Sequence, residues 1–182
     1  MAWTDWYKTV TEQMADLLNG AGVDGTEVPG LPVGGHSVVK DLTLSLDTDA
    51  YADGDVLADT QELAAAIRVA GGSGVVQSLV VVDKDDQGQA MDVYLLDSSG
   101  SLGTENSAVA VSDANAAKIL GKIAVGSGDY YDMGGVRVAS LANLSLVVEV
   151  SSGTSLYVGV VSRGAGTYTA SGVVLRFGIL QD

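Results

Sequence analysis

Hydrophobic and polar residues alternate along most of the chain after residue 37, and a period of two predicts β-strands. In Val38–Leu46, leucine occupies every second position from 42 to 46, and residues 62–70 alternate in the same way. Similar patterns occur at 55–58, 75–83, 90–97, 119–125, 136–141, 144–150, 155–163 and 173–180. Many short strands at a spacing of about 8–12 residues are typical of an all-β sandwich or barrel. We therefore predict a mainly β domain over residues 38–182, an antiparallel β-sandwich of jelly-roll type.

Two shorter segments interrupt the strand pattern. Residues 112–118, with the sequence SDANAAK, predict a short helix whose N-cap is Ser112. Residues 126–135 are rich in Gly and Asp and predict a loop that carries Tyr130 and Tyr131. These two tyrosines either hold the loop against the domain, which is the commoner arrangement, or contact a sugar or a partner protein.

The N-terminal segment has a different period. Apolar side chains recur there at steps of three and four residues, which predicts an amphipathic helix over about residues 4–19. Thr4 is its N-cap and Asn19-Gly20 its stop. The helix either packs on its own β-domain or docks on another subunit as an anchor, because an isolated helix of this length needs a partner surface. The candidate partner-binding residues are Trp3, Trp6, Tyr7, Val10, Met14, Leu17 and Leu18.

A connector joins this helix to the strands. Residues 20–37 contain both prolines of the chain, Pro29 and Pro32, among many glycines. Such a composition predicts a linker that is extended around the prolines and flexible at its ends. His36, the single histidine, is expected to be a linker side chain. The predicted organisation is thus a helix at 1–19, a linker at 20–37 and a β-sandwich at 38–182.

Composition and charge exclude several classes of function. The 182 residues include 47% hydrophobic residues, enough for a real core, and 24 glycines, which favour tight turns. A formal charge of −14 argues against binding to nucleic acid or to an anionic membrane surface. The chain has no cysteine, which excludes thiolate metal sites and cysteine nucleophiles. Neither a transmembrane stretch nor a signal-peptide pattern is recognisable.

Two acidic clusters are weak candidates for a cation site. The first begins as a calcium loop does, with Asp83 and Asp85 at positions one and three, but Tyr94 stands at position twelve where a bidentate Glu is expected. The second contains Asp47 and Asp49 in an order that matches no known loop. An acidic turn is favoured in both places, so we predict no metal and no cofactor.

Motifs for catalysis are also missing. No Ser lies in a G-x-S-x-G elbow, and one histidine leaves little scope for a triad. Residues 71–74 are glycine-rich but contain no Lys and precede a strand, unlike a phosphate-binding loop. The chain is therefore not expected to be an enzyme.

Several segments resemble virion proteins of tailed bacteriophages. The resemblance covers about residues 40–182 and leaves out the predicted helix and linker. It is carried by residues 50–59 (AYADGDVLAD), 71–88 (GGSGVVQSLVVVDKDDQG), 93–98 (VYLLDS) and 112–121 (SDANAAKILG), and by the tail pairs Leu156-Tyr157 and Thr167-Tyr168 with the stretch 161–164 (VSRG).

The resemblance implies a structural component of the virion. An acidic β-domain repels DNA and suits the outside of a particle. A helix and arm joined to a compact domain suit a capsid decoration protein of the cement or head-fibre type, bound to the major capsid protein or to other virion proteins. The alternative is a tail-tip, baseplate or fibre component that binds the host surface through loops 126–135 and 163–172. A homo-oligomer is expected in either role, and a trimer fits both a capsid three-fold position and a fibre.

Overall fold

The computed structural model describes residues 36–182, which form nine strands, one short α-helix and one 3-10 turn. In chain order the elements are β1 (His36–Thr43), β2 (Val56–Leu63), β3 (Ser73–Asp83), β4 (Met91–Leu96), α2 (Asp113–Ala116), β5 (Ile119–Val125), η1 (Ser127–Asp129), β6 (Tyr130–Asp132), β7 (Arg137–Glu149), β8 (Leu156–Ser162) and β9 (Val173–Gln181). The prediction of a mainly β domain is confirmed for this part of the chain.

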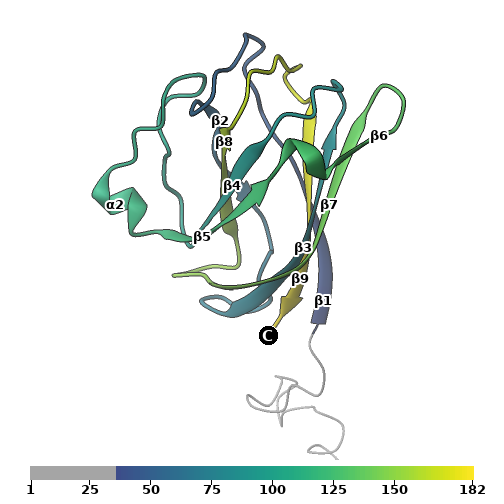
Figure 1. The fold of residues 1–182 in the computed structure, drawn as a ribbon. Helices are drawn as coiled ribbons and strands as arrows, with labels where there is room; N and C mark the ends of the chain where they lie inside the picture. The colour runs from purple at the N-terminus through teal and green to yellow at the C-terminus, as the bar shows by residue number, and fades with distance from the viewer. Residues whose placement is uncertain (1–35) are drawn as a thin grey trace, which may run out of the picture. The chain divides into compact units, whose positions relative to one another are not determined.

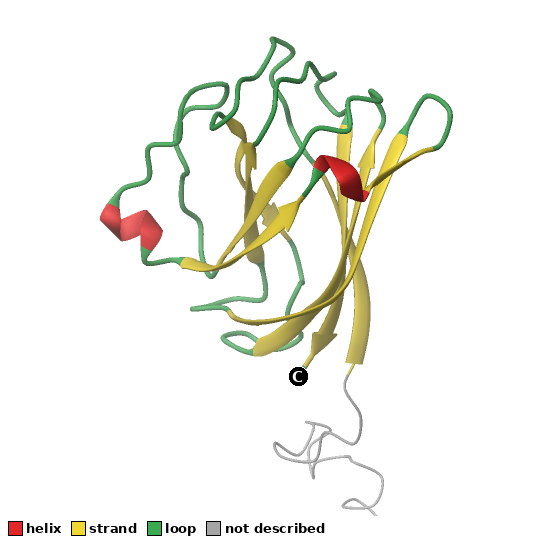
Figure 2. Ribbon diagram, viewed as in Figure 1, coloured by secondary structure: helices red, strands yellow, loops and turns green. Residues whose placement is uncertain are grey.

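The strands form two antiparallel sheets, which lie as two layers (Figures 1 and 2). One sheet has five strands in the order β1-β9-β3-β7-β6, and the other has four in the order β2-β8-β4-β5. Every pairing in both sheets is antiparallel.

The pairings are nested in the sequence. Strand β1 pairs with β9, β2 with β8, β3 with β7 and β4 with β5. Two further pairings, β3 with β9 and β4 with β8, join these strand pairs side by side into the two sheets. Apart from the short β6 at one edge, this is the strand order of an eight-stranded jelly roll.

The hydrophobic core lies between the two sheets because each strand sends every second side chain inward. In β9 the inward residues are Val173, Leu175, Phe177 and Ile179, and all four are buried. They join inward residues of both sheets in one continuous cluster. The strict alternation that predicted a strand at 173–180 therefore corresponds to one face in the core and one face outside.

The outer face of the four-stranded sheet is covered by residues 97–118, the segment that contains α2 (Figure 1). Leu102 is buried there against Val56 and Val161. Asp59 holds the segment in place, because its carboxylate accepts the Ser101 hydroxyl at 2.8 Å and the Leu102 N–H at 2.7 Å. The outer face is thus covered over β2 and β8, whereas Lys122 and Ala124 of the edge strand β5 are exposed.

Three predicted elements match the structure closely. The strand predicted at 75–83 is β3, which begins two residues earlier, and the strand predicted at 119–125 is β5. The short helix is α2, and the side chain of Ser112 accepts the N–H of Asn115 at its N-cap. These segments have strong local signals, a clean alternation or a capping residue.

The strand predicted at 55–58 lies in β2, but its separation from the strand predicted at 62–70, and the continuation of that strand beyond residue 63, are wrong. A single strand, β2, runs from Val56 to Leu63 and continues through polar residues, with register shifts against β8 before and after Ala58. Residues 64–72 form a turn in which Ala65 has a φ of 50°, a value outside strand geometry. Ile67 is buried in this turn, so its apolar character reflects packing of the turn against the core.

The division of the other long strand is also wrong. Residues 136–141 and 144–150 belong to one strand, β7, which bends where Asn143 and Ser145 take positive φ values of 59° and 50°. Opposite this bend, the pairing with β3 shifts between Val76 and Ser78. The polar residues that suggested a turn at this point form an irregularity within a continuous strand.

Two boundaries also differ from the prediction. His36, expected in the linker, is the first residue of β1, and its Nδ1 lies 3.0 Å from Oε1 of Gln181 on β9. Strand β1 ends at Thr43, before the predicted Leu46. Within the predicted loop at 126–135, residues 130–132 form β6. The predicted helix at 4–19 and the linker up to residue 35 lie outside the described residues.

Candidate functional site

The outer face of the five-stranded sheet is the largest feature of the described domain that its own packing leaves unexplained. Side chains at directly paired positions lie on the same face, so the registers of the five strands define this surface. Its apolar members are Val39, Val75, Val80, Val82, Tyr131, Val138, Val147, Val174 and Leu180. We call this set the apolar sheet face.

Part of the apolar sheet face is strongly exposed. Val39 is 63% exposed, Val147 68% and Tyr131 67%, whereas the valines between them are half-buried. Among residues 36–182, no segment covers this face in the way that residues 97–118 cover the other sheet. Polar residues such as Ser78 and Ser140 lie on the same face between these side chains. Exposed apolar side chains gathered on one face are a feature of interaction sites in soluble proteins.

A shallow hollow of about 210 Å³ lies at the β1 side of this face. Gly178 on β9 is paired with Val39 on β1 and lines the hollow with its backbone, while Ser78 of β3 lies directly against it on the other side. Gln77, at the irregular position of β3, lines the hollow together with Leu180. The hollow is mostly apolar and has room for one large side chain, so it suits a side chain of a partner protein.

One ion pair lies within the apolar sheet face. The guanidinium of Arg176 on β9 donates to both carboxylate oxygens of Asp41 on β1, at 2.7 and 2.9 Å. This hydrogen-bonded contact lowers the pKa of Asp41 below its ordinary value. The pair neutralises the two charges, so they do not prevent apolar contact on this face.

Replacing Arg176 by Gln is expected to return the pKa of Asp41 towards its ordinary value, because the guanidinium that lowers this pKa is removed. In the wild type the pair stabilises the fold above the ordinary carboxyl pKa, and this contribution is lost as the pH falls through the lowered value. NMR titration of the Asp41 carboxyl carbon measures the shift. The control is Lys40→Gln on the same strand, and a pKa that moves equally in both variants would contradict the assignment.

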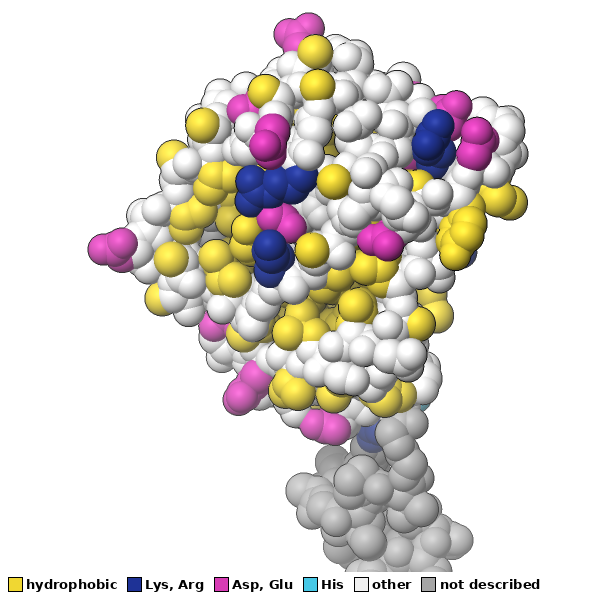
Figure 3. Space-filling model, in the orientation of Figure 1, with side chains coloured by type: hydrophobic (Ala, Val, Ile, Leu, Met, Phe, Trp, Pro, Cys, Tyr) yellow, Lys and Arg dark blue, Asp and Glu magenta, His cyan; other side chains and the backbone are white. Residues whose placement is uncertain are grey.

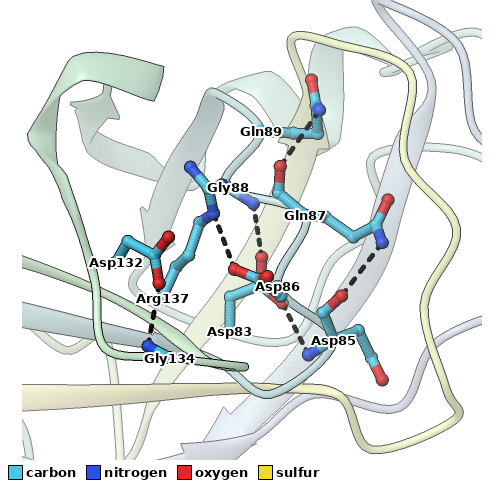
Figure 4. A network of polar contacts seen from close by, with 9 residues as sticks. All are labelled: Asp83, Asp85, Asp86, Gln87, Gly88, Gln89, Asp132, Gly134 and Arg137. Carbon is cyan, nitrogen blue, oxygen red and sulfur yellow. Dashed lines mark hydrogen bonds and ion pairs between the residues drawn. The ribbon is translucent and has the colours of Figure 1, made fainter.

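A polar network lies in the loop after β3 (Figure 4). The carboxylate of Asp83 is buried, 1% exposed, and accepts the N–H of Asp85 at 3.0 Å and the N–H of Gly88 at 2.7 Å. The loop between β8 and β9 is joined to this network, since Asp85 accepts the N–H of Thr169 at 2.8 Å. Asp86 accepts from Nε of Arg137, at the start of β7, at 2.8 Å.

The two weak metal candidates in this network, Asp83 and Asp85, thus tie loops together. The sequence favoured an acidic turn here; the turn is present, and Asp83 is buried within it. Residues 36–182 contain no group of three or more His, Cys, Asp or Glu side chains placed to hold a metal ion.

The other acidic cluster is also tied into the fold. Asp47 accepts the N–H of Asp49 at 3.1 Å, and this contact lowers the pKa of Asp47. The N–H of Asp47 donates to the hydroxyl of Tyr51 and to Glu105, both at 2.7 Å. Asp47 and Asp49 are therefore held in a hydrogen-bonded turn, which binds the β1–β2 connection to the segment near residue 105.

The tyrosines of the predicted loop at 126–135 point in opposite directions. Tyr130 packs against the core and its hydroxyl is buried without a hydrogen-bond partner, as is the hydroxyl of Tyr168. Burial raises the pKa of both phenols, so both stay protonated. Tyr131 and Met133 are strongly exposed. One tyrosine thus anchors this segment, and the other is free to contact a partner.

Four basic side chains of the described domain, those of Lys122, Arg137, Arg163 and Arg176, form ion pairs with aspartates. Asp92 is buried on β4, where it accepts from Nε of Arg163 at 2.7 Å and lies 3.1 Å from Nζ of Lys122. The hydrogen bond to Asp92 raises the pKa of Arg163. In Figure 3 the basic side chains on the visible face lie beside acidic ones. Such pairing leaves no basic surface patch on this face for phosphate groups.

The predicted partner-binding residues Trp3, Trp6, Tyr7, Val10, Met14, Leu17 and Leu18 lie outside the described residues, so they remain a prediction. Sequence reasoning did not find the apolar sheet face. The signal for it was the continuous apolar run Leu79–Val82 in β3, because a strand with one solvated face would alternate. Within residues 36–182, the helices are too short or too polar to cross a membrane.

Comparisons with known proteins give only distant structural likenesses. No family model matches the chain, and no curated protein is detectably similar to it. Among solved structures, the capsid of Ralstonia phage GP4 matches at 19% identity and a TM-score of 0.37, over 90% of this chain and 94% of that chain. A structure of desmodium yellow mottle tymovirus matches at 9% identity and a TM-score of 0.29, over 85% and 91% of the two chains. Likenesses this distant do not establish what the present chain does.

Proposed function

We propose that this chain is a structural virion protein of a tailed bacteriophage that decorates and stabilises the capsid exterior, as a cement or head-fibre protein does. The observation that carries the proposal is the apolar sheet face, which the described domain leaves uncovered, whereas residues 97–118 cover much of the outer face of the other sheet. The resemblance of residues 40–182 to phage virion proteins supports it. The jelly-roll strand order also supports it, since this architecture recurs in viral capsid domains.

The physical role would be mechanical. Apolar contact between the domain and neighbouring virion proteins removes valine side chains from water, at about 25 cal/mol per Å² of apolar area. Many copies on one lattice add their modest contacts through avidity. Binding to the assembled particle then stabilises the particle by mass action. A net charge of −14 keeps the protein away from packaged DNA and favours the outside of the shell.

The N-terminal segment is proposed to be the anchor on the major capsid protein or another virion protein. Its apolar residues, Trp3 to Leu18, recur with the period of a helix face. The domain that begins at His36 would then project from the attachment point, and a homo-oligomer would follow the symmetry of that point.

The alternative function is a tail-tip, baseplate or fibre component that binds the host surface. The observation in its favour is the pair of exposed side chains Tyr131 and Met133 in and beside β6. An exposed tyrosine is a common contact for sugars and proteins. The two functions differ in where the protein lies on the particle.

Labelling of intact virions tests the proposal. Antibodies raised against the domain, residues 36–182, are applied to purified particles and located by electron microscopy. We expect label over the whole head, because a decoration protein occurs at every equivalent lattice position. Label confined to the tail end would contradict the capsid role and favour the alternative.

Virions that carry a truncated chain test, in the same experiment, whether the N-terminal segment is the anchor. Virions are assembled with a chain that lacks residues 1–35, the boundary that β1 defines. If the N-terminal segment is the anchor, these particles lose the label while the truncated domain remains soluble and folded. Retained label would show that the domain itself attaches to the particle and would contradict the role of the N-terminal segment as the anchor.

A further inference from the structure

The edge of strand β1 differs from the other sheet edges of the described domain. Exposed edges invite pairing with another strand, and proteins protect them with short strands, bulges or covering segments. The edge strand β6 is only three residues long, and β2 has two register shifts. The edge strand β5 pairs with β4, and this pairing has a register shift between Leu95 and Leu96. Strand β1 pairs over eight consecutive residues with no shift and contains no proline.

The backbone groups that face this edge follow from the pairing with β9. Just past the end of β1, the N–H of Leu44 donates to the carbonyl of Val173 at 3.0 Å. Because hydrogen-bonded positions alternate along an antiparallel pair, the even-numbered residues of β1 direct their backbone N–H and C=O groups towards β9. The odd-numbered residues, Ser37, Val39, Asp41 and Thr43, therefore direct their N–H and C=O groups away from the sheet. All four are exposed, and within residues 36–182 no strand pairs with this side of β1.

We propose that β1 pairs antiparallel with β1 of a second copy of this chain, about a two-fold axis at Val39. The two-fold axis brings the same edge of both copies together in opposite directions. Each outward N–H of one copy then meets an outward C=O of the other copy. The two five-stranded sheets would become one continuous sheet. The apolar sheet faces of both copies would then lie side by side on the same surface.

Charge disfavours two registers next to the proposed one. Directly opposed residues must project to the same face, so the axis passes through a residue of β1. An axis at Lys40 sets two ammonium groups opposite each other, and an axis at Asp41 sets two carboxylates opposite each other. An axis at Val39 opposes Val39 to its copy and Asp41 to Ser37, which brings no like charges together. Like charges directly opposed destabilise a strand pair.

The contact at the axis also favours a second copy. Val39 is 63% exposed and borders the apolar hollow beside Gly178. In the proposed pair, two valines meet at the centre and the hollows of both copies flank them. The Asp41 carboxylates stay paired with Arg176 of their own chains, so they add little repulsion.

Sedimentation velocity of the full chain over a range of concentrations tests the pairing. We expect a dimer that Val39→Asp converts to a monomer, because two carboxylates would face each other at the axis. The matched control is Val147→Asp, which is equally exposed on the same face but three strands away. Loss of the dimer in both variants would show association through the face and would overturn edge pairing. A wild-type monomer or trimer would overturn it as well.

Cross-linking gives a second, independent readout. The chain has no cysteine, so a single substitution introduces one thiol per copy. Hydrogen-bonded antiparallel pairs have Cα atoms about 5.5 Å apart, within the range for a disulfide. We expect Val39→Cys to form a disulfide dimer under mild oxidation and Val147→Cys to remain a monomer. Equal cross-linking of both would contradict the register. The inference does not depend on the virion role, so label on the head or tail leaves it unchanged.

Discussion

Replacement of Phe177 by Ala is expected to lower the free energy of unfolding by about 3–5 kcal/mol, the range for a large aromatic side chain removed from a core. Phe177 is fully buried, and its strand, β9, is flanked by β1 and β3. The side chain belongs to the core cluster, to which both sheets contribute. Urea denaturation followed by circular dichroism measures the loss. It would be a large part of the 5–15 kcal/mol that is typical of whole domains.

The control for this variant is Leu180→Ala on the same strand. Leu180 lies on the apolar sheet face and is 38% exposed, so its truncation is expected to cost less than about 1 kcal/mol in the monomer. Similar losses in the two variants would mean that β9 does not divide its side chains between the core and the outer face as described.

Asp83→Ala is expected to cost about 2–6 kcal/mol, because it leaves two backbone N–H groups without their acceptor at a cost of about 1–3 kcal/mol each. The groups belong to Asp85 and Gly88, and the carboxylate that serves them is buried. Urea denaturation measures the cost. The loop after β3 is also expected to become more sensitive to limited proteolysis, since its shape depends on these two bonds.

The comparison variant is Asp86→Ala, three residues away in the same loop. Asp86 is a partly exposed member of an ion pair with Arg137, and such pairs contribute about 0–1 kcal/mol. The two substitutions remove the same functional group from the same loop. An equal effect would show that burial of the Asp83 carboxylate does not decide its contribution.

The sequence predicted those strands in which one face meets the core and the other meets solvent. Strand β9 has this character, and its alternation located it to within a residue. Strand β2 was divided because its middle, Asp59 to Gln61, is polar. The carboxylate of Asp59 accepts hydrogen bonds from residues 101 and 102, which are more than forty positions away in the sequence. A local pattern contains no information about such a partner.

The same limit applies to the candidate site. Strands of both sheets carry apolar residues on both faces, so the local pattern could not distinguish a covered outer face from a bare one. In the four-stranded sheet, Leu102 arrives from a distant segment and covers it. For the five-stranded sheet, the described chain supplies no such segment. Only the arrangement in space separates Val161, which is buried, from Val147, which is exposed.

The nested strand order has a consequence for how the domain folds during synthesis. Strand β9, the last strand of the domain to be made, lies between β1 and β3 and pairs with both. Until residues 173–181 have left the ribosome, β1 has no partner in its own sheet. The hairpin of β4 and β5, by contrast, joins near neighbours in the sequence and can form early. The five-stranded sheet, with its apolar face, is therefore completed only after translation of the whole domain, and chains stalled before β9 would expose unpaired strands to aggregation.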